Sequence, residues 1–200
     1  MRIRTTVAAL ATAAALAVPL LPTAAQADAP AGSSDRLTLG QKAARSAQHG
    51  TGPAPAIAPG YIRIHSLYQY NTGQCLDADA EAGGNGTRVQ VWGCNGQSQQ
   101  EWLSRSDGSL ENVRFPGMCL DADTGRAGGN GTWMQLWQCT GGANQKWFTR
   151  ANDPSIYNQA YNNNLNTVVD RDTGWGGDGA SAQLWQKVNQ SQQWWQIVPA

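Results

Sequence analysis

A pattern that occurs three times along the chain restricts the possible folds more than any other feature. Each copy begins with an apolar pair followed by aspartate, at Cys75-Leu76-Asp77, Cys119-Leu120-Asp121 and Val168-Val169-Asp170. A turn with glycine follows, at Asn85-Gly86, Asn130-Gly131 and Asp178-Gly179. Each copy then contains a Gln-x-Trp segment, at Gln90–Trp92, Gln135–Trp137 and Gln183–Trp185. Three ordered copies of such a pattern indicate an internal structural repeat.

Each copy closes with a second glutamine and tryptophan, at Gln100-Glu101-Trp102, Gln145-Lys146-Trp147 and Gln193-Trp194-Trp195. The closing glutamines are 45 and 48 residues apart, and a unit of this length holds about four short strands. Asn-Gly and Asp-Gly between alternating apolar residues predict β-hairpins. A propeller needs four to eight blades, so three units that close on themselves predict an all-β, three-fold, barrel-like body.

The strand that carries each Gln-x-Trp segment has two different faces. Residues two apart share a face, so Val89 and Val91 lie opposite Gln90 and Trp92. The same division recurs in the other copies, with Met134 and Leu136 opposite Gln135 and Trp137, and Ala182 and Leu184 opposite Gln183 and Trp185. We expect the aliphatic face to be buried, and the glutamine and tryptophan to point toward the surface or a shallow pocket.

The N-terminus has the three parts of a secretory signal peptide. Arg2 and Arg4 precede an alanine- and leucine-rich run over residues 7–21, and Ala25-Gln26-Ala27 forms a small-x-small cleavage site. The sequence therefore predicts a signal peptide over 1–27 and a secreted, extracellular protein. A membrane anchor is the alternative, but this run is shorter than the roughly 20 residues of a spanning helix and is interrupted by Pro19.

Residues 28–60 contain no aromatic residue and no cysteine, and they are rich in Ala, Gly, Ser and Pro. This composition predicts a disordered tail, since it offers little apolar surface to bury. All sixteen aromatic residues occur at Tyr61 or later. The expected globular domain therefore covers 61–200, with repeats at about 61–106, 107–153 and 154–200.

The four cysteines allow three disulfide pairings. Export to an oxidising compartment favours disulfides, and the spacing favours Cys75 with Cys94 and Cys119 with Cys139. No C-x-x-C motif is present and the domain has a single histidine, His65, so we expect no metal site and no cofactor. Basic and acidic residues number 14 each, which argues against nucleic acid as a partner. No apolar run is long enough for a membrane partner, and the oligomeric state stays open.

The repeated Cys-Leu-Asp, Asn-Gly-Thr, Gln-Leu-Trp and Gln-x-Trp series resembles the ricin B-type lectin repeat of family-13 carbohydrate-binding modules. The resemblance covers residues 61–200 and implies a β-trefoil with three pseudo-symmetric repeats. It also implies that sugar contacts lie at equivalent positions in each repeat. These are Asp77, Gln90, Trp92, Gln99 and Gln100; Asp121, Gln135, Trp137, Asn144 and Gln145; and Asp170, Gln183, Trp185, Gln192 and Gln193.

These residue types suit sugar recognition. A carboxylate accepts hydrogen bonds from two hydroxyls, an amide both donates and accepts, and an indole stacks on the C–H face of a pyranose. Only the middle repeat has the family's asparagine, at Asn144, and the third has Val168 and Lys187 in place of the cysteines. We therefore expect binding to be strongest in the middle repeat, then in the first, then in the third.

Other tryptophans and aspartates have competing interpretations. We expect the closing tryptophans, Trp102, Trp147 and Trp195, to form the core, although Trp92, Trp137 and Trp185 could also serve packing. The indoles outside the pattern, Trp133, Trp175 and Trp194, are extra stacking surface or filler. The second aspartates, Asp79, Asp123 and Asp172, are typical of turns.

The pattern predicts a secreted, non-enzymatic protein that binds galactose- or xylose-type glycans or polysaccharides. A glycoside hydrolase needs two carboxylates about 5–10 Å apart in unlike environments, whereas the recurring carboxylates here are equivalent by repeat. A trefoil used as a protein-binding or inhibitor scaffold is the other alternative. Near-identical polar groups in three repeats favour repeated small ligands over a single protruding inhibitory loop.

Overall fold

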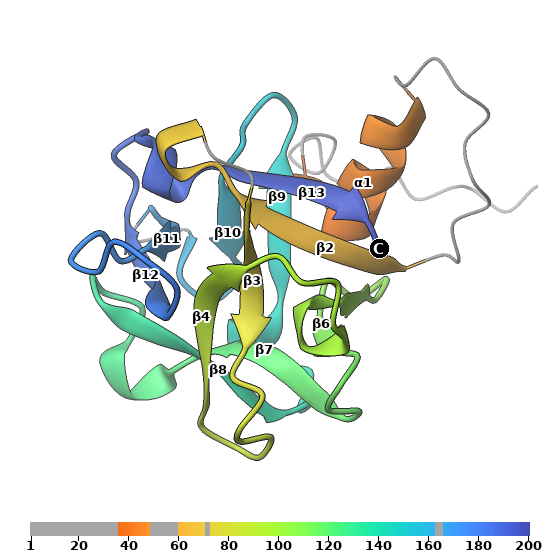
Figure 1. Cartoon of the computed structure of the whole chain (residues 1–200), viewed down its shortest axis with the longest axis vertical. Helices are drawn as coiled ribbons and strands as arrows, with labels where there is room; N and C mark the ends of the chain where they lie inside the picture. The colour runs from red at the N-terminus through yellow and green to blue at the C-terminus, as the bar shows by residue number, and fades with distance from the viewer. Residues whose placement is uncertain (1–35, 49–59, 71–72, 163–165) are drawn as a thin grey trace, which may run out of the picture. The chain divides into compact units, whose positions relative to one another are not determined.

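Four strands from each repeat form the body of the structure, a computed structural model that describes residues 36–48, 60–70, 73–162 and 166–200 (Figure 1). The first repeat supplies β2 (Tyr61–Ser66), β3 (Gln74–Ala78), β4 (Thr87–Gly93) and β5 (Trp102–Ser104). The second supplies β6 (Leu110–Asn112), β7 (Met118–Ala122), β8 (Thr132–Gln138) and β9 (Trp147–Arg150). The third supplies β10 (Ile156–Asn158), β11 (Thr167–Arg171), β12 (Ala180–Gln186) and β13 (Trp195–Pro199).

Short 3-10 helices connect some of these strands, and two further elements precede them. The 3-10 helices are η1 (Tyr68–Tyr70), η2 (Ser98–Gln100), η3 (Thr124–Arg126), η4 (Ala143–Gln145) and η5 (Ser191–Gln193). The elements before the first repeat are β1 (Arg36–Leu37) and α1 (Leu39–Gln48). Because η2, η4 and η5 each end at a closing glutamine, the same local turn places that residue in all three repeats.

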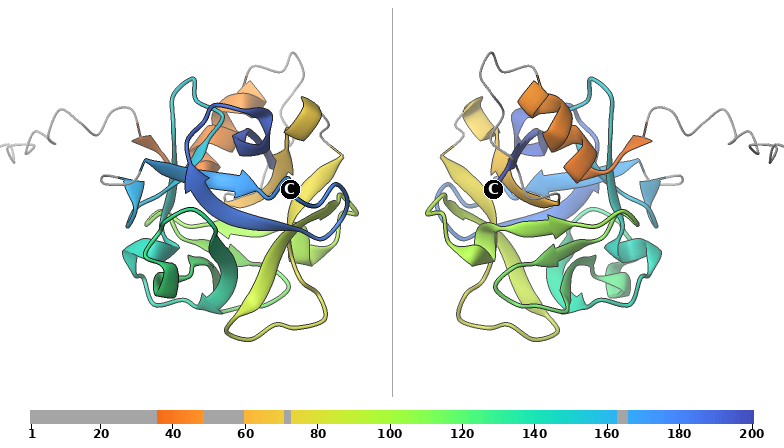
Figure 2. Two further views of the ribbon diagram at one scale, coloured as in Figure 1. Left: turned by 90° about the vertical axis from the view of Figure 1, so that its left-hand side faces the viewer. Right: turned by 90° about the vertical axis from the view of Figure 1, so that its right-hand side faces the viewer.

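The strands pair in a way that closes the three repeats on one another. Each repeat contains a long hairpin, β3–β4, β7–β8 or β11–β12, and β13 of the last repeat pairs with β2 of the first. The second strands of the hairpins also pair with each other, as β4–β8, β8–β12 and β12–β4. Figure 2 shows these strands from two sides. The arrangement agrees with the β-trefoil that the resemblance implied.

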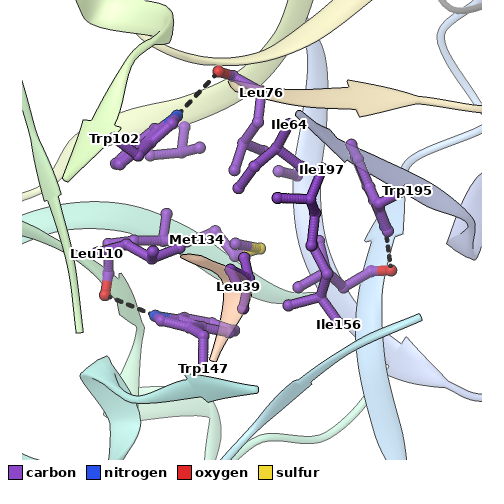
Figure 3. Packing of buried hydrophobic residues seen from close by; sticks show 14 of the residues in the cluster. Leu39, Ile64, Leu76, Trp102, Leu110, Met134, Trp147, Ile156, Trp195 and Ile197 are labelled. Atoms are coloured by element: carbon purple, nitrogen blue, oxygen red, sulfur yellow. Dashed lines mark hydrogen bonds between the residues drawn. The ribbon is translucent and has the colours of Figure 1, made fainter. Parts of the chain in front are cut away.

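The three closing tryptophans form the centre of the core, as predicted. Trp102, Trp147 and Trp195 are 0%, 1% and 2% exposed, and they surround a cluster of aliphatic side chains (Figure 3). A buried indole N–H needs an acceptor. Each one donates to a backbone carbonyl in its own repeat, at Leu76, Leu120 or Val169, over 3.0–3.2 Å.

The glycine turns connect different repeats as well as the strands of their own hairpins. Gly86, Gly131 and Gly179 have φ of 86°, 80° and 89°, a conformation that glycine adopts without strain. The residue before each glycine accepts a hydrogen bond from a backbone N–H in another repeat. The pairs are Asn85 with Gln138 at 2.7 Å, Asn130 with Gln186 at 2.6 Å, and Asp178 with Gly93 at 2.8 Å. The turn of each repeat therefore docks at the end of a Gln-x-Trp strand in the next.

The predicted disordered tail over 28–60 is wrong for residues 36–48. β1 pairs with β9, and α1 packs against β13 and β2 (Figure 1). Thr38 and Gln41 form a reciprocal capping box, in which each backbone N–H donates to the other side chain, over 2.9 and 3.1 Å. Leu39 and Ala43 are both buried members of the core cluster, and Leu39 lies among the core tryptophans and isoleucines (Figure 3). Composition predicted disorder here, but burial of Leu39 and Ala43 is enough to order this segment because the three repeats already provide the rest of the core.

The predicted signal peptide over 1–27 and the tail segments 28–35 and 49–59 lie outside the described residues. In the part of the chain that the structure describes, no helix is both long and apolar enough to cross a membrane.

Both predicted disulfides are present, as Cys75–Cys94 and Cys119–Cys139. In the third repeat Lys187 occupies the second cysteine position and forms an ion pair instead. Its Nζ donates to Asp153 Oδ2 at 2.5 Å and to the Tyr157 hydroxyl at 2.7 Å. Burial opposes ionisation of Asp153, but the hydrogen bonds from Lys187, Tyr157 and Ser155 outweigh it and lower its pKa to about 2. A polar cluster thus replaces the third covalent link.

Candidate functional site

The middle repeat has the most complete constellation of predicted site residues. Asp121 on β7 lies directly opposite Gln135 on β8 in the sheet register, and Gln135 Nε2 donates to Asp121 Oδ1 at 3.1 Å. The second carboxylate oxygen, Oδ2, accepts from Asn144 Nδ2 at 2.8 Å and from Gln145 Nε2 at 3.0 Å. Trp137 lies two residues beyond Gln135 on the same strand face and is 40% exposed. An acceptor, amide groups and a flat indole therefore meet at one surface.

Burial raises the pKa of Asp121 above its ordinary value, while the hydrogen bonds from Gln135, Gln145 and Asn144 oppose the rise. The carboxylate is thus fixed in one orientation by three amides from two different segments of the repeat. A fixed, partly desolvated acceptor suits neutral hydroxyl ligands, because it need not reorganise when a ligand arrives.

The closing glutamines lie behind the carboxylates rather than at the surface. Gln145 is buried, its Oε1 accepts from the Thr140 N–H at 2.8 Å, and its Nε2 also donates to the Gln138 carbonyl at 2.9 Å. The buried Gln100 and Gln193 make the equivalent backbone contacts in their repeats. This geometry gives them a positioning role: they tie the loop after the Gln-x-Trp strand to the site.

The first repeat places its predicted residues around a hollow of about 390 Å³, which Asp77, Gln90, Trp92 and Gln99 help to line. Gln90 Nε2 donates to Asp77 Oδ1 at 3.2 Å and Gln100 Nε2 donates to Oδ2 at 2.9 Å. Burial raises the pKa of Asp77, and the amide hydrogen bonds oppose that rise. Gln99 Oε1 is buried and accepts no hydrogen bond from the described part of the chain. Because this oxygen has no solvent access we assign it no ligand contact; the Gln99 side chain instead helps to hold the Asp77 carboxylate.

The third repeat brings fewer groups to its carboxylate. Gln183 Nε2 donates to Asp170 Oδ1 at 3.2 Å, while Gln192 Nε2 turns to the side chain of Gln190. Burial therefore dominates and raises the pKa of Asp170 to about 6, against weaker opposition from Gln183 and Gln193. Trp185 remains exposed at the same relative place as Trp137. The third site has the same outline but the least support for an ionised carboxylate.

The second aspartates form turns, as predicted. The Oδ1 atoms of Asp79, Asp123 and Asp172 accept from the backbone N–H two residues on, over 2.9–3.1 Å. Of the tryptophans outside the pattern, Trp133 and Trp175 are 59% and 62% exposed, so they are not core filler.

The docked turns at the edges of the sites were not predicted from the sequence. A carbon added at Gly179 would lie 3.8 Å from Cζ3 of Trp92 and 3.9 Å from Oε1 of Gln90. One added at Gly131 would lie 4.0 Å from Cζ3 of Trp185. Each of these turns therefore lies beside the Gln-x-Trp residues of another repeat, at ordinary van der Waals distance. The repeated Asn-Gly and Asp-Gly pairs were the available signal, but such pairs also occur in hairpins that contact no other repeat.

Comparison with known proteins identifies a family and a fold. The family model described as the ricin-type beta-trefoil lectin domain matches residues 63–194. A curated relative, Serine protease 1 of Rarobacter faecitabidus, is 45% identical over 129 residues, which cover 64% of this chain and 22% of that protein. The chain therefore spans about a fifth of the length of this relative.

Two solved structures show the same fold. The designed three-fold symmetric protein ThreeFoil superposes with a TM-score of 0.60 at 20% identity, covering 70% of this chain and 99% of that one. The Vibrio vulnificus hemolysin/cytolysin β-trefoil lectin, solved with N-acetyl-D-lactosamine bound, superposes with a TM-score of 0.54 at 21% identity. That match covers 72% of this chain and 96% of the lectin. The predicted β-trefoil is confirmed.

Proposed function

The chain belongs to the ricin-type β-trefoil lectin domain family, and on that premise we propose that it is a secreted protein that binds galactose- or xylose-type units of glycans or polysaccharides. The family and the fold support carbohydrate binding. The sugar class, the export of the protein and the individual contact residues belong to our proposal.

One observation carries the proposal: a buried aspartate, a neighbouring glutamine and a half-exposed tryptophan recur together in three repeats. The carboxylate and amide can hold adjacent hydroxyls while the indole supports the apolar face of the ring. The bound N-acetyl-D-lactosamine of the Vibrio lectin favours a glycan ligand here as well. Each site is shallow and weak alone, so binding to a polymer gains from two or three sites acting together.

We assign no catalytic role to these carboxylates. In the first two repeats amide donors hold both oxygens of the aspartate, and the recurring aspartates have equivalent places in the fold. A glycoside hydrolase instead needs an acid and a base in unlike surroundings. The matched protease has a much greater length than this chain, and its activity is not transferred.

The test is retention on columns of xylan, galactan and immobilised galactose. Asp121→Ala and Trp137→Ala should weaken retention several-fold while leaving the protein folded. Trp175→Ala is the matched control, because that indole is also exposed but lies outside the three sites. A wild-type protein that elutes unretarded from all three columns would contradict the proposal, and release of reducing ends would contradict the non-catalytic assignment.

A further inference from the structure

A hollow of about 310 Å³ lies where the three repeats meet, and Gln135 is the one residue of the three Asp/Gln/Trp sites among its lining residues. Strands β4, β8 and β12 pair with each other there, and each repeat contributes residues to the lining. The volume is at the lower end of the range of small-molecule sites, which often occur at the mouths of β-barrels. We call this feature the axial hollow, since equivalent positions of the repeats surround it.

The floor of the axial hollow is apolar. Val89, Met134 and Ala182, which occupy equivalent positions in the three strands, line it and are themselves almost fully buried in the core. Each belongs to the aliphatic face of its strand, so the floor is the end of the core. An apolar floor with few polar groups above it is the usual composition of a small-ligand site.

The rim residues differ in polarity and charge, whereas the floor residues are all apolar. The residues just before the floor positions are Arg88, Trp133 and Ser181, which offer a cation, an indole and a hydroxyl. Three identical groups around a symmetry axis would recognise a symmetric ligand, whereas three different groups can orient an asymmetric one. Gln135, which also lines the hollow, adds an amide.

The two large rim groups are held in place before any ligand arrives. The Arg126 guanidinium lies 4.7 Å from the ring centroid of Trp133, which still leaves that indole 59% exposed. The Arg88 Nη2 donates to the Gly179 carbonyl and to the Ser181 hydroxyl, the latter at 2.9 Å. Among the described residues these bonds use only Nη2, so they leave Nε and Nη1 of the guanidinium for a ligand. Groups that are already fixed lose less entropy on binding.

The charged residues at the axial hollow favour a negatively charged ring ligand over a neutral one. Its lining contains Arg88 and no carboxylate, and Arg126 stands behind Trp133. A planar guanidinium matches a carboxylate with two parallel hydrogen bonds. We infer that the axial hollow binds a sugar ring that bears a carboxylate, a uronic acid unit, stacked on Trp133 with its carboxylate at Arg88 and its hydroxyls at Ser181 and Gln135. This fourth site differs in chemistry from the three sites for neutral sugars.

The experiment is an NMR titration of the full chain with sodium D-glucuronate, following the indole N–H signal of Trp133. That signal is identified by its loss in Trp133→Phe. Glucuronate should shift it, and D-glucose at the same concentration should not. Arg88→Gln should weaken glucuronate binding at least about tenfold, the usual effect of losing a charge-assisted contact.

Two variants serve as controls. Arg114→Gln removes an exposed arginine that lies beside Phe115 and away from the hollow, and it should leave glucuronate binding unchanged. Asp77→Asn impairs a neutral-sugar site that shares no lining residue with the hollow, and it should also leave glucuronate binding unchanged. The Asp77→Asn variant separates this inference from the proposed function, because glucuronate can bind to a protein that is not retained on xylan or galactan.

Three results would overturn the inference. Equal shifts with glucose and glucuronate would show that the charge of Arg88 is not used. Binding of benzoate without binding of glucuronate would assign the hollow to aromatic acids rather than to sugars. Full glucuronate affinity in a folded Arg88→Gln protein would place the ligand elsewhere on the molecule.

Discussion

Asp170→Asn should stabilise the protein at neutral pH, although it removes a residue of a proposed binding site. Asp170 is 4% exposed, and burial raises its pKa to about 6 from an ordinary value of 3.8. Keeping the carboxylate ionised in the folded state therefore destabilises that state by about 3 kcal/mol relative to the protonated form. Asparagine has nearly the same shape and no charge, so the variant avoids this loss.

The effect must depend on pH with a defined sign. The folded pKa lies above the unfolded one, so the neutral Asp170 stabilises the protein fully below about pH 4, and this contribution is lost as the pH rises through 6. The difference in free energy of unfolding between variant and wild type should therefore grow by about 3 kcal/mol from pH 3.5 to pH 7.5. Urea unfolding, followed by the fluorescence of the buried tryptophans, measures this difference at each pH.

Asp121→Asn is the matched control, because this carboxylate has more hydrogen bonds. Asn144 and Gln145 both donate to Asp121 Oδ2, so an amide group there would place a donor against donors. We expect this variant to lose about 1–3 kcal/mol at pH 7.5. A difference in free energy of unfolding between Asp170→Asn and wild type that does not change with pH, or equal destabilisation of both variants at pH 7.5, would contradict a raised pKa of Asp170 as the cause.

Four further outcomes follow from the structure. Trp147→Ala should lower the free energy of unfolding by about 3–5 kcal/mol in a urea titration, because it leaves a cavity in the core and removes the donor to the Leu120 carbonyl. A loss under about 1 kcal/mol would contradict the core assignment of Trp147. Leu39→Ala should lower it by about 2–3 kcal/mol without changing polysaccharide retention, and no loss would mean that α1 is not docked. Replacing Cys119 and Cys139 by serine should lower the melting temperature, with a loss on the order of 3 kcal/mol, and weaken retention together. In a protein whose other two sites are disabled, retention should weaken between pH 7 and pH 5 as Asp170 is protonated, and a constant retention would show that the ionised form is not required.

The repeats contained enough information for the fold and the core. Each repeat specifies its own hairpin through Asn-Gly or Asp-Gly and its own core indole through the closing tryptophan, so three local signals agree with one global arrangement. The burial of Val89 and Val91, and the exposure of Trp92 on the other face, follow from strand alternation alone.

The helix α1 could not be predicted from composition, because its stability comes from the surface on which it lies. Leu39 fills a place among Trp147, Ile156 and Ile197 that only the assembled repeats create (Figure 3). Its local signal, Thr38 followed by Gln41 three residues later, is short and was hidden in an alanine- and serine-rich segment.

Asn144 in the middle repeat, and Val168 and Lys187 in the third, predicted that the sites differ, but not how their side chains are arranged. The Gln99 side chain hydrogen-bonds Asp77 in the first repeat, whereas Gln192 donates to Gln190 in the third, and this difference depends on side-chain rotamers. The same limit applies to the carboxylates, whose pKa values depend on how many amides reach each buried oxygen.

The docked turns make the three repeats mutually dependent in a directed cycle. The turn of the first repeat hydrogen-bonds to the second repeat, the turn of the second to the third, and the turn of the third to the first, through Asp178 and Gly93. A solenoid of stacked repeats can lose a repeat from one end and stay folded, because each repeat contacts only its neighbours. The three repeats of this chain form a closed cycle of contacts, so none of them is a terminal repeat that can be removed without loss of such contacts. A single excised repeat would lack both the turn that supports its own Gln-x-Trp strand and the strand that receives its turn, so we expect all three repeats to be needed for any one of the proposed sites to form.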